Sequence, residues 1–115
     1  MPQFANPFQG NVDKKLSKGE ILQSLRIDIA GELEAIFLYD AVVMATDDEV
    51  VKKVLSDIRD EEKEHCGELL ALMRYLEGDL SGFLSEGMGE VKEMMEKLGI
   101  KESDIKRATG PLEAE

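Results

Sequence analysis

Apolar residues recur every three or four positions along two long stretches of the chain, the spacing that one face of an α-helix produces. The first stretch runs from Leu22 to Val43 and the second from Val51 to Leu76. Between and around them Leu, Glu, Lys, Met and Ala dominate, and all five are good helix formers. The prolines lie at positions 2, 7 and 111, near the two ends. The pattern therefore predicts an all-α protein.

Two capping signals set where these helices begin. Ser17 followed three residues later by Glu20 matches a capping box and predicts a helix over about 18–45. Thr46 followed by Glu49 is a second such box and predicts the start of the next helix. Because the connection is so short, we expect the two helices to form a long antiparallel hairpin.

The end of the hairpin and the region after it are marked by glycines. The second helix is expected to end at Glu77, with Gly78 following its last turn. A loop is predicted over 79–85 and a short C-terminal helix over 86–98, which Gly99 ends.

This reading divides the chain into three parts. Residues 1–16 form an N-terminal arm, residues 17–99 a helical domain, and residues 100–115 a polar tail with one helical turn after Ser103 at most. At 115 residues there is room for a single small domain.

Charge and cysteine content exclude several classes of partner and site. A formal net charge of −11 argues against nucleic acid and against an anionic membrane surface as partners. Cys66 is the one cysteine, so an intramolecular disulfide and a thiolate-rich metal site are both excluded. The N-terminus lacks the pattern of a signal peptide, and no apolar run is as long as a membrane span. We expect a cytoplasmic protein.

Four residues interrupt the two aliphatic stripes: Glu32 and Tyr39 in the first, Glu62 and His65 in the second. A carboxylate on a core stripe is costly unless a base or a metal compensates its charge. Glu32 lies fifteen residues before position 47 and Glu62 fifteen after it, so both should lie about 22 Å from the turn. His65 is one turn beyond Glu62 on the same face. One hairpin therefore brings two carboxylates and one imidazole to about the same distance from its turn.

This set is half of a known site. Ferritin-like di-iron centres take one Glu from each of two helices and a Glu-x-x-His from each of the other two. The chain has one such Glu, one Glu-x-x-His, one histidine and two long helices. A symmetric dimer would complete a ferritin-like four-helix bundle holding two iron ions. The alternative is a buried acid–histidine pair that fixes helix register and binds nothing.

The segments ELEAIFLYD at 32–40 and DEEKEH at 60–65 resemble the two motifs of the encapsulated ferritins, especially the archaeal members. The resemblance covers about residues 18–78. It implies iron ligands at Glu32, Glu62 and His65 across a dimer interface, with Tyr39 close behind them. It also implies ring-shaped decamers that work inside an encapsulin shell and oxidise Fe(II).

A further acid is assigned through the same resemblance. Glu34 matches a residue of an iron entry site, although Gly31 stands where some members have a second carboxylate. Glu61, Glu64 and Glu68 could extend an iron path or could form a solvated helix face. Tyr39 could hydrogen-bond a ligand carboxylate, pass an electron, or be an ordinary core tyrosine.

We therefore expect a ferroxidase whose catalytic residues are Glu32, Glu62, His65 and Tyr39, and whose metal ligands are Glu32, Glu62, His65 and Glu34. The cofactor is iron, two ions per dimer. The expected partners are a second copy of the chain and the encapsulin shell protein, within a cytoplasmic nanocompartment. Two alternatives remain: a rubrerythrin-like di-iron peroxidase or oxidase, and a non-enzymatic dimeric helical adaptor.

Overall fold

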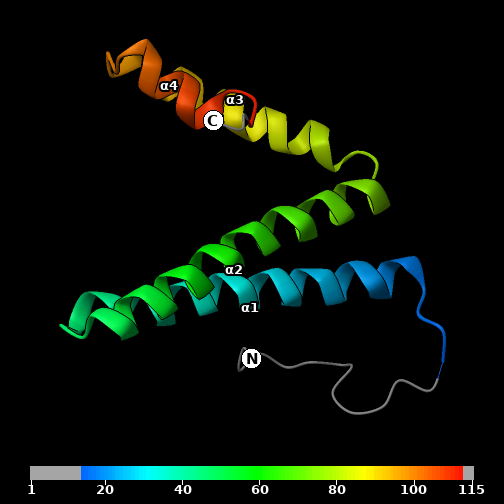
Figure 1. Ribbon diagram of the computed structural model, residues 1–115. Coiled ribbons are helices and arrows are strands. Elements are labelled where there is room, and N and C mark those ends of the chain that lie inside the picture. The colour runs from blue at the N-terminus through cyan, green and yellow to red at the C-terminus, as the bar shows by residue number, and fades with distance from the viewer. Residues whose placement is uncertain (1–13, 113–115) are drawn as a thin grey trace. The chain divides into compact units, whose positions relative to one another are not determined.

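The computed structural model describes residues 14–112, and every regular element in that range is an α-helix (Figure 1). The helices are α1 (Lys18–Ala45), α2 (Glu49–Leu76), α3 (Leu80–Lys97) and α4 (Glu102–Thr109). The chain packs as two units, one ending at Glu77 and the other beginning at Gly78. The all-α prediction is confirmed. The predicted arm lies mostly outside the described residues.

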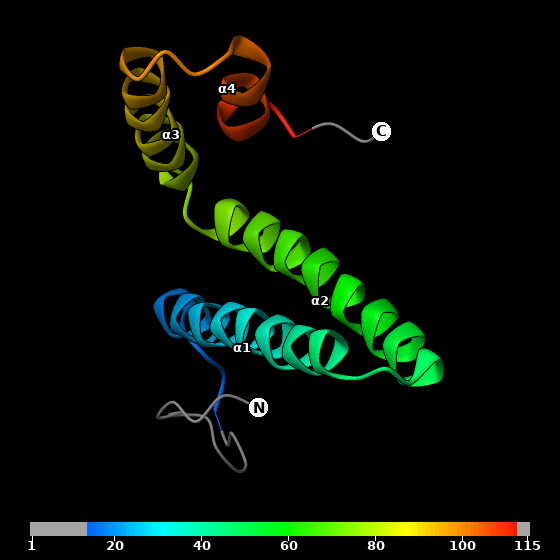
Figure 2. The same cartoon turned by 90° about the vertical axis from the view of Figure 1, so that its left-hand side faces the viewer.

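The first unit is a hairpin of two 28-residue helices that run antiparallel and side by side (Figure 2). The predicted box at the start of α1 is confirmed. The Glu20 backbone N–H donates to Ser17 Oγ at 3.2 Å, and Glu20 Oε1 accepts from the Ser17 backbone N–H at 3.0 Å. This second bond lowers the pKa of Glu20 most, and a hydrogen bond from Lys14 lowers it further.

The start of α2 differs from the prediction. Asp48, not Thr46, caps the helix, and its Oδ1 accepts from the backbone N–H groups of Val50 and Val51 at 2.9 and 3.1 Å. Thr46 instead ends α1, and its Oγ1 accepts from the Asp48 backbone N–H at 3.1 Å. An aspartate carboxylate is the stronger cap, because its negative charge is also attracted to the positive end of the helix dipole.

Asp48→Ala is therefore expected to destabilise each chain by about 1 kcal/mol, because two backbone donors lose their acceptor. Asp47→Ala is the matched control, since it removes the neighbouring carboxylate without removing the cap. Thermal unfolding followed by circular dichroism compares the two. Equal losses for both variants, or a loss for Asp47→Ala alone, would contradict this assignment of the cap.

The helix α2 ends one residue before the predicted Glu77, and the loop predicted over 79–85 is wrong. Only Glu77, Gly78 and Asp79 separate α2 from α3, and the Asp79 carbonyl accepts from the N–H groups of Gly82 and Phe83. Leu80 and Phe83 extend the apolar stripe of the third helix, and Gly82 is tolerated within it.

Gly99 ends α3 as predicted, with a φ of 74°. Its N–H donates to the Glu96 carbonyl, and the N–H of Ile100 donates to the Met95 carbonyl, which together form a Schellman motif. Among the glycines in the described part of the chain, it alone has a positive φ. Gly78 follows the C-cap Glu77, as predicted, but it does not adopt the left-handed conformation of Gly99.

The polar tail predicted after residue 100 contains the eight-residue helix α4. Ile105 is its one fully buried residue, and α4 packs on α3. The Thr109 hydroxyl donates to the Ile105 carbonyl at 2.8 Å, and Arg107 pairs with Asp104 at 3.0 Å. A single apolar residue in a charged segment was too weak a signal to predict two full turns.

The hairpin buries very little by itself. Leu25, 7% exposed, is the only fully buried apolar residue between positions 14 and 77. Nine large apolar side chains on α1 and α2 are exposed, and they are Leu33, Phe37, Leu38, Val42, Met44, Val50, Val54, Leu72 and Tyr75. Exposed apolar side chains in such number are typical of a chain that associates with a partner. No helix among residues 14–112 is both long enough and apolar enough to cross a membrane.

Candidate metal centre

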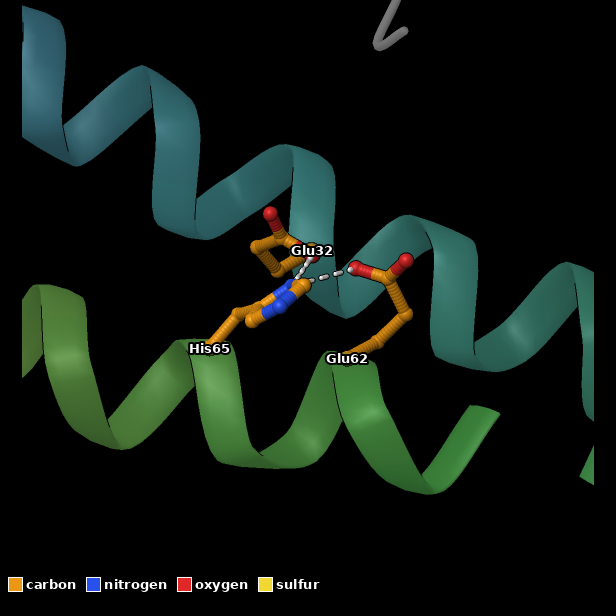
Figure 3. A group of neighbouring side chains, drawn as sticks. All are labelled: Glu32, Glu62 and His65. Atoms are coloured by element: carbon orange, nitrogen blue, oxygen red, sulfur yellow. Dashed lines mark ion pairs between the residues drawn. The ribbon is translucent and has the colours of Figure 1, made fainter. Parts of the chain in front are cut away.

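Glu32, Glu62 and His65 converge at one level of the hairpin, as predicted from their equal distances to the turn. Glu32 comes from the middle of α1, and the other two lie one turn apart on α2 (Figure 3). His65 Nδ1 lies 3.5 Å from Glu32 Oε2 and 3.4 Å from Glu62 Oε2. One possible ligand atom from each residue lies within 4.8 Å of the other two.

The cluster is open to solvent on one flank. The side chains of Glu62 and Glu32 are 18% and 25% exposed, whereas that of His65 is 46% exposed. All three line a hollow of about 460 Å³. The other lining residues are Ile27, Asp28, Gly31, Ala35, Tyr39, Glu68 and Leu69. The two carboxylates are therefore largely covered by α1 and α2, whereas the imidazole is exposed to solvent.

The two other predicted site residues lie differently. Tyr39 lines the hollow together with the cluster. Glu34 is half-buried but belongs neither to the cluster nor to the lining of the hollow. Glu34 comes two residues after Glu32, which is a rotation of about 200° around the helix axis. Its side chain therefore lies on nearly the opposite side of α1. Its role stays a prediction.

Asp28 was missed by sequence reasoning. It lines the same hollow and lies one turn before Glu32 on α1. The spacing of four residues was the available signal, but Asp28 is not on the aliphatic stripe that singled out Glu32. Glu68, considered for an iron path, also lines the hollow, whereas Glu61 and Glu64 do not.

A charged network crosses the hairpin one turn from the cluster. Arg59 Nη1 donates to Asp40 Oδ1 on α1 at 2.7 Å, and Arg59 Nε donates to Asp60 Oδ1 at 3.2 Å. These hydrogen bonds raise the pKa of Arg59, and the bond to Asp40 contributes most. The bond from Arg59 is also the main cause that lowers the pKa of Asp60, and Lys63 at 3.5 Å adds to it.

The donor set fits a hard, redox-active cation. Two carboxylates and an imidazole suit iron, and carboxylate oxygens favour Fe(III) over Fe(II). Three side chains are few for an ion that usually takes six ligands, and the imidazole is 46% exposed in the single chain. The fold and this cluster together define a long helical hairpin that carries a group of carboxylate and histidine side chains able to hold a metal ion.

The chain belongs to the EncFtn-like family, whose profile matches residues 11–86. The predicted resemblance to the encapsulated ferritins is confirmed. The chain is 42% identical over 89 residues to a ferritin-like–encapsulin shell fusion protein of Pyrococcus furiosus. It is 38% identical over 88 residues to the encapsulin nanocompartment cargo protein EncC of Myxococcus xanthus.

These matches cover 77% and 76% of this chain, and 26% and 67% of the two relatives. The chain therefore spans about a quarter of the length of the fusion protein. Among solved structures, the encapsulated ferritin domain from Pyrococcus furiosus matches with a TM-score of 0.71 and 40% identity. That match covers 80% of this chain and 94% of the domain.

Proposed function

We propose that the protein is a ferroxidase that oxidises Fe(II) to Fe(III) at a di-iron site formed between two copies of the chain. The observation that carries this proposal is the convergence of Glu32, Glu62 and His65 on the open flank of a hairpin with almost no core of its own. A two-fold axis through that flank would supply a second set of the same donors.

Each residue has a distinct task in this proposal. Glu32 and Glu62 bind the ions through hard oxygens, and His65 adds one nitrogen donor per ion. Fe(II) held by these donors would be the substrate that gives electrons to dioxygen. Tyr39, on the wall of the same hollow, either hydrogen-bonds a ligand carboxylate or passes an electron.

The exposed surface supports association on the flank where the site opens. Gly31 and Ala35 line the hollow and lie about 60–100° around α1 from Glu32. On α2, Leu72 lies seven residues, or two turns, after His65 on the same face, and its side chain is exposed. A partner hairpin docked there would cover this apolar surface and complete the four-helix bundle.

A second apolar surface on α1 supports an assembly larger than a dimer. Leu33, Phe37 and Met44 are exposed and lie about 100–140° from Glu32 in the opposite sense from Gly31 and Ala35. A helix that is apolar on every side is normally buried on every side. The dimer proposed above leaves this face uncovered, which is consistent with the decameric ring that the resemblance implies.

The names of the relatives support a location inside a protein compartment. One is named as a fusion with an encapsulin shell and the other as an encapsulin cargo. We therefore propose that this protein works inside an encapsulin nanocompartment in the cytoplasm. Confinement there would keep the Fe(III) product away from the rest of the cell.

Mixing the anaerobic, Fe(II)-loaded protein with dissolved oxygen tests the activity. We expect Fe(III) to form faster than in a protein-free control, and the rate to be proportional to protein concentration. A rate equal to the protein-free control would rule out the ferroxidase. Replacing oxygen with hydrogen peroxide then distinguishes the ferroxidase from the peroxidase alternative, which would prefer peroxide. The adaptor alternative predicts no bound iron at all.

A further inference from the structure

Besides the candidate ligands, arginine side chains join α1 to α2 and to Glu77, the residue that caps the end of α2. Arg59 pairs with Asp40 at 2.7 Å, and Arg26 pairs with Glu77 at 3.2 Å near the open end. The Arg59 side chain is 21% exposed and that of Arg26 is 45% exposed. Arg59 is also held by Asp60, so both sides of its guanidinium are fixed.

The Arg59 pair runs obliquely along the hairpin. Arg59 lies twelve residues after position 47 and Asp40 seven before it, a difference of five residues or about 7 Å of helix rise. Side chains tilt toward the N-terminus of their own helix, so these two point toward each other in an antiparallel pair. Because the contact is oblique, a slide of one helix along the other would stretch it in one direction and compress it in the other.

The cluster needs such a restraint. Glu32 and Glu62 are like charges on different helices, and they repel each other when no cation lies between them. Their approach depends on the two helices keeping their register, and a shift of one residue would move one carboxylate by about 1.5 Å. Arg59 is three residues from Glu62, so its pair acts within one turn of the cluster.

We infer that Arg59 is a positioning residue for the metal centre: through Asp40 it holds α1 and α2 in the register that brings Glu32 opposite Glu62. This inference rests on the proposed function only in that the cluster binds a metal. The Arg26 pair is more exposed, and its Glu77 lies twelve residues beyond His65, just past the end of α2, so we expect it to restrain the cluster less.

The experiment titrates Co(II), a spectroscopic stand-in for Fe(II), into the full chain and into Arg59→Gln, Arg59→Lys and Arg26→Gln. We expect Arg59→Gln to weaken Co(II) binding about 3- to 10-fold and to raise KM for Fe(II) by a similar factor. Arg59→Lys keeps the pair to Asp40 and should recover most of the affinity. Arg26→Gln should stay within about twofold of wild type.

A double-mutant cycle with Asp40→Asn adds a second criterion. If Arg59 acts through Asp40, the Arg59→Gln/Asp40→Asn variant should bind Co(II) no more weakly than the worse single variant. Additive losses, or equal losses for Arg59→Gln and Arg26→Gln, would overturn the inference. Lower stability of Arg59→Gln with unchanged Co(II) affinity and KM would also overturn it. A wild-type chain that binds no Co(II) would instead overturn the proposed function.

Discussion

His65→Ala is expected to slow protein-dependent Fe(II) oxidation by about 100-fold or more, because each chain loses its one nitrogen ligand. The lost imidazole lies 3.5 Å or less from a carboxylate oxygen of both Glu32 and Glu62, and these two remaining members of the cluster offer only oxygen donors. The measurement is the initial rate of Fe(III) formation after mixing with oxygen, with the protein-free rate subtracted. Glu32→Ala and Glu62→Ala should cause losses of similar size.

Glu64→Ala is the matched control for these variants. Glu64 is an exposed acid next to His65 on α2, but it does not line the hollow. Its removal should leave the rate within about twofold of wild type, as for most surface substitutions. An active His65→Ala protein would mean that the cluster is a register-fixing acid–histidine pair. A loss in Glu64→Ala would instead return this acid to the iron path.

Leu72→Glu is expected to abolish both dimerisation and iron oxidation, although it leaves all three candidate ligands in place. Leu72 is 44% exposed in the single chain and lies two turns from His65 on the same face. In the proposed dimer a two-fold axis would bury two such residues, and two buried unpaired carboxylates would cost far more than the apolar contact gains. We expect oxidation to fall at least about 10-fold at concentrations where wild type is fully assembled.

Phe37→Glu separates the site interface from the second apolar surface. Phe37 is 68% exposed and lies about 140° around α1 from Glu32. The variant should form smaller assemblies than wild type while retaining the dimer and its oxidation rate. Size-exclusion chromatography with light scattering reports the mass.

A Leu72→Glu protein that is monomeric yet oxidises iron at the wild-type rate would show that one chain suffices.

The parts of the fold that were predictable are those with dense local signals. The capping box at Ser17 and the regular aliphatic stripes placed α1 and α2 to within about a turn. The site cluster was predictable because Glu32, Glu62 and His65 interrupt those stripes at equal heights, and elementary helix geometry brings them together.

Two of the errors arose where local signals competed. Thr46 and Asp48 are both plausible caps from the sequence. Only the structure shows that Asp48 accepts the two backbone hydrogen bonds at the start of α2. Gly82 favoured a loop by composition, whereas the apolar spacing around it favoured α3. Asp28 was not predictable from the stripe, because it lies off the aliphatic stripe although it lines the same hollow as Glu32.

The central claim is that two chains share the metal site. Native mass spectrometry after anaerobic loading with Fe(II) tests it most directly, because it reports the number of chains and of irons in the same ion. We predict about one iron per chain, present only in assemblies with an even number of chains, and iron-free monomers. Monomers that carry iron, or dimers that remain iron-free at saturating Fe(II), would contradict the claim.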